Sequence, residues 1–129
     1  MMDRPMKVLL VEDLEESRTV LRAMNERLGH RVVEAAHGKE AVQVALDSNP
    51  DLVLMDLSMP EADGLQATSA LRAISSFRDV NHLPVIALTA YPETLSVEKA
   101  YQAGCDGYLQ KPVDLTDLDA ALRRFLRTA

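Results

Sequence analysis

The sequence has few of the residues that support disulfide, aromatic-stacking or histidine chemistry. It contains no tryptophan, three tyrosines and two phenylalanines, and Cys105 is its single cysteine. One cysteine excludes a disulfide within the chain and fits a reducing compartment. We expect Cys105 to be a small packing residue. The histidines are scattered, and we expect His30, His37 and His82 to lie on the surface without binding metal.

Long apolar segments are also missing. No run approaches the roughly 20 apolar residues that a membrane-spanning helix needs. The first residues include Asp3, Arg4 and Pro5, where a secretory signal would need an apolar stretch. The sequence therefore predicts a cytoplasmic protein with no membrane contact.

Positive charge is scarce. Fourteen Lys and Arg residues face 20 Asp and Glu residues, which gives a net charge of −6, and no basic run is present. Direct binding to nucleic acid is therefore not expected. The 129 residues suit one domain spanning the whole chain, residues 1–129, with a core from about residue 6 to residue 126.

Short apolar runs alternate with helical patterns along the chain, as βαβ units require. The runs predict strands at Met6–Val11, Arg31–Ala35, Leu52–Met55, Pro84–Leu88 and Gly107–Gln110. The helical patterns cover Ser17–Leu28, Gly38–Leu46, a segment through Leu65, Leu71 and Ile74, Pro92–Ala103, and a last helix that Asp114 caps. Gly29 and Gly104 are expected to end two of these helices. The fold class is therefore α/β: a flavodoxin-like, doubly wound parallel sheet of five strands in the order 2-1-3-4-5, between two helical layers.

Charged residues stand where the strands end. Glu12 and Asp13 follow the first strand, Asp56 follows the third, and Lys111 follows the fifth. Chemistry in such sheets collects beyond the carboxyl ends of the strands, so these groups should meet at one edge. Crowded carboxylates repel one another and need a cation. This arrangement predicts a magnesium site that contains a nucleophilic aspartate.

Four motifs in chain order resemble the receiver domain of two-component response regulators. They are Val11-Glu12-Asp13, the run from Asp56 to Gly64, Leu88-Thr89-Ala90, and Lys111-Pro112. The resemblance covers about Met6 to Phe125 and implies an Mg²⁺ (or Mn²⁺) cofactor. It implies that Asp56 accepts a phosphoryl group. It assigns Asp13 as a direct metal ligand, Glu12 as a ligand through water and Ser58 as a ligand through its carbonyl.

The resemblance also implies a conformational switch. Lys111 would pair with the phosphoryl group, and its bond to Pro112 would be cis. The Thr89 hydroxyl would move inward and donate to a phosphoryl oxygen. Tyr108 would then turn from solvent into the space left behind Thr89. Tyr91 and Ser58 should border the entrance for attacking water, so Tyr91 is predicted to slow hydrolysis.

These roles imply a protein that signals through contacts. The donor would be a histidine kinase or a histidine phosphotransfer protein, in a phosphorelay or a simpler pathway. The chain would catalyse its own phosphorylation and dephosphorylation. It would signal to an unidentified output protein through the fourth helix, fifth strand and fifth helix, a face that could also form a homodimer.

Other readings of the same residues stay open. The chain could be a receiver-like interaction module that is never phosphorylated. It could be a hydrolase with an aspartyl-phosphate intermediate, although Ser58 stands where such enzymes usually place a second acid. A flavodoxin-like cofactor binder is disfavoured, because Glu12 to Glu16 form an acidic loop that would repel phosphate. Glu12 and Asp13 could also simply cap the first helix.

Overall fold

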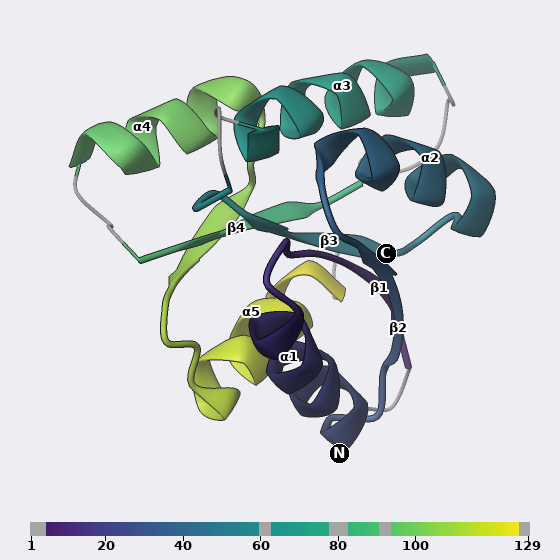
Figure 1. Ribbon diagram of the computed structural model, residues 1–129, viewed down its shortest axis with the longest axis vertical. Helices are drawn as coiled ribbons and strands as arrows, with labels where there is room; N and C mark the ends of the chain where they lie inside the picture. The colour runs from purple at the N-terminus through teal and green to yellow at the C-terminus, as the bar shows by residue number, and fades with distance from the viewer. Residues whose placement is uncertain (1–4, 60–62, 78–82, 91–93, 127–129) are drawn as a thin grey trace.

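A computed structural model describes residues 5–59, 63–77, 83–90 and 94–126. Strands and helices alternate through these residues (Figure 1). The strands are β1 (Lys7–Val11), β2 (Arg31–Ala35), β3 (Leu52–Asp56), β4 (Val85–Thr89) and β5 (Gly107–Gln110). The helices are α1 (Glu15–Arg27), α2 (Gly38–Ser48), α3 (Asp63–Phe77), α4 (Thr94–Ala103) and α5 (Leu115–Leu126). The predicted α/β class is confirmed.

The strands form one parallel sheet in the predicted order β2-β1-β3-β4-β5. Figure 1 shows α1 and α5 on one face of the sheet and α2, α3 and α4 on the other. Alternate residues of β1 and β3 supply the two cores, because successive side chains of a strand point to opposite faces. One core contains Leu9 and Val53, and the other contains Leu10 and Leu54. The central strands are therefore buried on both faces, which holds their carboxyl ends in place.

Several element boundaries follow the local signals in the sequence. Gly29 and Gly104 adopt positive φ angles of 95° and 114° where α1 and α4 end. The Asp114 carboxylate accepts hydrogen bonds from the N–H groups of Thr116 and Asp117 at the start of α5. Helix α1 begins at Glu15, two residues before the predicted start at Ser17, since acidic side chains favour the positive end of a helix.

The prediction for His30 is wrong. His30 is buried, and its Nδ1 accepts a hydrogen bond of 3.0 Å from the Met6 N–H. His30 lies in the turn between α1 and β2, so this hydrogen bond connects the turn to Met6, the residue before β1. His37 is exposed as predicted, and His82 lies outside the described residues. Cys105 is buried, as expected for a packing residue. Within the described residues, no helix has the length and apolar character needed to cross a bilayer.

Candidate functional site

The candidate site lies where β1 and β3 end side by side. Val11 pairs with Met55 in the sheet, so the residues that follow each strand are neighbours. Asp56 is the last residue of β3, one residue beyond the predicted end of that strand. Glu12 continues β1, and its N–H donates to the Ala35 carbonyl of β2 at 3.1 Å. The strand order therefore brings both acids to the switch point of the sheet.

Three carboxylates converge at this edge. Glu12, Asp13 and Asp56 each offer an oxygen, and these oxygens all lie within 4.8 Å of one another. Glu12 is fully buried and Asp56 is 1% exposed, whereas Asp13 is open to solvent. Carboxylate oxygens are the ligands that Mg²⁺ prefers, and a partly open site lets the ion keep some of its water. The residues present therefore fit the cation that the sequence predicts.

Lys111 reaches the same acids from the end of β5. Its Nζ lies 3.0 Å from Oδ1 of Asp56 and 3.1 Å from Oε2 of Glu12. The Lys111 N–H donates to the Thr89 carbonyl at 2.8 Å, and the Lys111–Pro112 peptide bond is cis. Burial lowers the pKa of Lys111, but its hydrogen bonds to Asp56 and Glu12 and their charges outweigh this, so the pKa is raised. The ammonium is therefore charged at neutral pH.

Glu12 is the acid most affected by its surroundings. The pKa of Glu12 is raised from 4.5 to about 7, first because the carboxyl is buried and then because of its hydrogen bond with Asp56, while Lys111 acts in the opposite direction. Oε1 of Glu12 also accepts a hydrogen bond of 3.2 Å from the Leu14 N–H. A cation near these oxygens would favour the ionised carboxylate.

The chain after Asp56 folds back on it. The Ser58 N–H donates to Oδ1 of Asp56 at 2.9 Å. Gly64, at the start of α3, packs so closely that a Cβ there would lie 2.5 Å from the Asp56 carbonyl oxygen. This close packing at Gly64 was not predicted from the sequence. A glycine eight positions past the candidate acceptor was the only signal available, and it is weak without knowledge of this packing.

The two predicted switch residues lie on neighbouring strands. Thr89 ends β4 and is 5% exposed, and β4 lies between the acceptor strand and β5. Tyr108 pairs with Ala87 and is 43% exposed, so it lies at the surface in this structure. Tyr91, predicted to border the entrance for water, lies outside the described residues.

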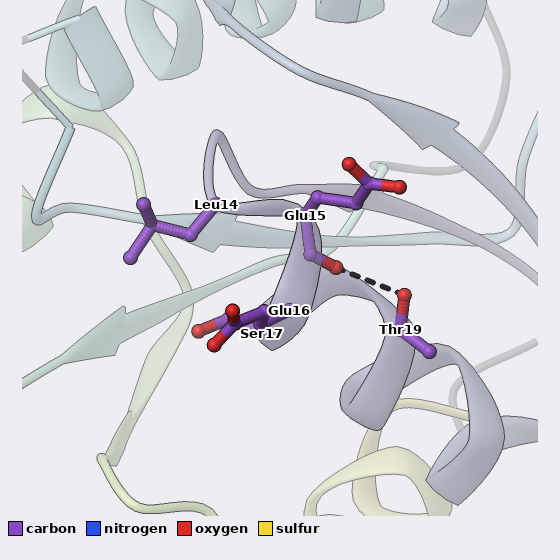
Figure 2. A pocket seen from close by; sticks show the side chains of 5 residues that line it. All are labelled: Leu14, Glu15, Glu16, Ser17 and Thr19. Carbon is purple, nitrogen blue, oxygen red and sulfur yellow. Dashed lines mark hydrogen bonds between the residues drawn. The ribbon is translucent and has the colours of Figure 1, made fainter.

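The first turn of α1 forms an open pocket next to the acids. Figure 2 shows its lining residues Leu14, Glu15, Glu16, Ser17 and Thr19, with the Thr19 hydroxyl donating to the Glu15 carbonyl oxygen. Leu14 is 61% exposed although it is apolar. An adjacent, mainly apolar groove runs between α1 and the chain after β5, and its lining includes Val20, Leu21, Met24, Lys111, Pro112 and Val113.

Comparisons with known proteins agree on one family. The family model described as "Response regulator receiver domain" matches residues 8–123. The polar-differentiation response regulator DivK of Brucella anthropi is 34% identical over 125 residues, which cover 97% of this chain and 99% of that protein. DivK of Brucella ovis is 34% identical over 122 residues, or 95% of this chain and 97% of that protein.

Solved structures show the same likeness. The chemotaxis protein CheY4 of Vibrio cholerae has a TM-score of 0.84 at 27% identity, covering 95% of this chain and 99% of that one. The receiver domain of a sensor histidine kinase from Pseudomonas aeruginosa has a TM-score of 0.82 at 36% identity, covering 95% and 98%. That receiver was solved with a magnesium ion coordinated in its active-site cleft.

Proposed function

The chain belongs to the family of response regulator receiver domains, and on that premise we propose that Asp56 accepts a phosphoryl group in a magnesium-dependent reaction. The observation that carries the proposal is the meeting of Glu12, Asp13, Asp56 and Lys111 at one edge of the sheet. The three acids and the ammonium come from the ends of β1, β3 and β5, which lie far apart in the sequence. They match what phosphoryl transfer to a carboxylate needs.

Asp56 is the proposed nucleophile. One oxygen of its carboxylate attacks the phosphorus of a phosphohistidine, the bond from phosphorus to the imidazole nitrogen breaks, and its electron pair returns to the ring. The Ser58 N–H donates to Oδ1 of Asp56 and limits its rotation. Burial of Asp56 among β1, β3 and β4 keeps the carboxylate aligned for an in-line approach.

Magnesium and Lys111 share the charge in this proposal. Asp13 and Asp56, together with the Ser58 carbonyl, would hold the ion directly, and Glu12 would hold it through water. When bound, Mg²⁺ reduces the repulsion between Asp56 and the incoming anion. The Lys111 ammonium already lies at hydrogen-bond distance from Asp56, where it can stabilise charge that develops on the transferring oxygens.

The phosphodonor is proposed to be a histidine kinase or a histidine phosphotransfer protein. Its docking site is the apolar groove that α1 forms with Pro112 and Val113. Lys111 belongs both to the wall of this groove and to the acid cluster. A helix of the donor seated in the groove would therefore lie beside Asp56. Such donors present their histidine in the cytoplasm, which is where we place this chain.

The output is proposed to be a change at α4, β5 and α5. A phosphoryl group adds nearly two negative charges and three acceptor oxygens at Asp56. The Thr89 hydroxyl donates to one of them, and Tyr108 turns inward from its exposed position. The altered face binds an output protein or a second copy of the chain. This is a two-state element biased by local charge.

The test is intact mass spectrometry after incubation with acetyl phosphate. The parent protein should gain one phosphoryl group with MgCl₂ and none with EDTA, and Asp56→Asn should gain none in either buffer. Circular dichroism checks that the variant is folded. A gain that does not depend on magnesium argues against the proposed site. The absence of any gain favours an interaction module that is never phosphorylated.

A further inference from the structure

The main chain of Glu12 is held from two sides. Its N–H donates to the Ala35 carbonyl at 3.1 Å, and its carbonyl accepts a hydrogen bond of 2.9 Å from Nη1 of Arg18. Arg18 lies one turn into α1 and reaches back to the end of β1. The backbone of this buried acid is thus tied both to a strand and to a helix.

Glu34 holds Arg18 in position for this contact. Nε of Arg18 donates to Oε1 of Glu34 at 3.1 Å, and Glu34 directly precedes Ala35 in β2. The other oxygen of Glu34 lies 2.6 Å from Nη1 of Arg22. The Glu12 N–H thus contacts Ala35 of β2 directly, and the Glu12 carbonyl is connected through Arg18 to the adjacent residue, Glu34. The two arginines share one partner, and in the part of the chain that the structure describes, only Arg18 also contacts Glu12.

We propose that Arg18 is a positioning residue for the metal centre, which holds the Glu12 backbone so that its carboxylate stays beside Asp13 and Asp56. The inference rests on the proposed magnesium site. Glu12 is fully buried, so a shift of its main chain moves its carboxylate relative to the other two acids. Residues that orient metal ligands commonly change metal affinity by about 10- to 100-fold when removed.

Charge and position predict opposite effects at Arg18. Removing a positive charge near a cation site should, by charge alone, strengthen Mg²⁺ binding. Loss of positioning should weaken it, because the acids then no longer converge. The sign of the change in Mg²⁺ affinity therefore distinguishes the two roles. Arg22 provides the control for loss of the ion pair with Glu34, because it has the same partner.

The experiment measures Mg²⁺ binding by isothermal titration calorimetry, without any phosphodonor. Arg18→Met keeps most of the apolar stem and removes the donors, and Arg22→Met is the matched control. Arg18→Met should raise the dissociation constant about 10-fold, whereas Arg22→Met should stay within about twofold of the parent. Urea unfolding of each variant reports the stability that both lose with the Glu34 ion pair.

The inference is overturned if Arg18→Met binds Mg²⁺ as tightly as the parent or more tightly, or if Arg22→Met weakens binding equally. Should Arg18→Met not fold, Arg18→Gln takes its place. It removes the charge but keeps an amide donor, and a weakening of about threefold or more is then expected and tighter binding contradicts the inference. If the parent binds no Mg²⁺, the proposed function fails. If the parent binds Mg²⁺ and Arg18→Met binds it equally tightly, the inference alone fails.

Discussion

Nζ of Lys111 lies 3.0 Å from Oδ1 of Asp56, although Asp56 ends β3 and Lys111 follows β5, with β4 between these strands. The same ammonium lies 3.1 Å from Oε2 of Glu12. In this structure one charged group therefore balances two buried acids. A bound cation would balance part of this negative charge, so that Lys111 could interact with the phosphoryl oxygens.

Replacing Lys111 by Met should slow phosphorylation while leaving the metal site in place. We expect the rate with acetyl phosphate to fall about 10²- to 10³-fold, the usual cost of removing one group that stabilises developing charge. Mg²⁺ affinity should stay equal or improve, because a competing positive charge is gone. Stopped-flow or quenched-flow kinetics and calorimetry measure the two effects separately.

Lys7→Met is the matched control for that prediction. The Lys7 ammonium donates to the Ser48 carbonyl at the opposite edge of the sheet, 2.8 Å away. Its loss should leave the phosphorylation rate within about twofold of the parent. Equal phosphorylation rates for Lys111→Met and the parent would show that Lys111 takes no part in the transfer.

The stability of the metal-free protein should depend on pH through Glu12. Its pKa is raised from 4.5 to about 7, so the folded protein binds a proton that the unfolded chain has released between these values. Protonated Glu12 therefore contributes to the free energy of unfolding in full below about pH 4.5, and this contribution is lost as pH rises through about 7. Relative to the parent, Glu12→Gln should gain about 2 kcal/mol of unfolding free energy between pH 5 and pH 8. Urea unfolding in EDTA measures this difference, and a constant difference across the range would contradict the assignment.

His30 should have the opposite dependence on pH. Burial lowers its pKa below 6.5, Asp119 on α5 opposes this effect, and Arg123 on α5 adds to it. Protonation would also cost the hydrogen bond that Nδ1 accepts from the Met6 N–H. The parent should therefore lose stability relative to His30→Asn as pH falls below about 6.5, by at most about 1.4 kcal/mol per pH unit.

In His30→Asn, the side-chain Oδ1 can still accept a hydrogen bond from the Met6 N–H, but the side chain no longer titrates. His37→Asn is the comparison variant, since it makes the same substitution at an exposed histidine. A parent and a His30→Asn variant that keep the same stability difference from pH 7.5 to pH 5.5 would show that His30 is not a buried neutral imidazole.

Gly38→Ala should destabilise the fold. The Gly38 N–H donates to Oδ2 of Asp63 at 2.5 Å, and a Cβ on Gly38 would lie 2.8 Å from Cγ of Asp63. The added methyl group should cost about 1–3 kcal/mol, because α2 and α3 must separate. Gly107→Ala is the control, since its Cβ would meet Phe125 at an ordinary 3.5 Å. Comparable losses from the two substitutions in urea unfolding would count against a specific clash at Gly38.

Much of the fold could be predicted from the sequence because its signals are local and repeated. Apolar runs that end in Asp56 or precede Glu12 indicate parallel strands, and parallel strands share an edge at their carboxyl ends. The burial of His30 could not be predicted, since one histidine in a turn belongs to no periodic pattern. The contact between Arg18 and Glu12 depends on how α1 lies against β2, and an arginine on a helix usually indicates a solvated position.

The most direct measurement of the central claim is chemical identification of the residue that carries phosphorus. Borohydride reduces an aspartyl phosphate to homoserine, which tandem mass spectrometry of peptides can place in the sequence. After treatment with acetyl phosphate and Mg²⁺, the account predicts homoserine at position 56, and none when EDTA replaces the metal. Homoserine at another aspartate, or unmodified Asp56 in a protein that has gained a phosphoryl group, would contradict it.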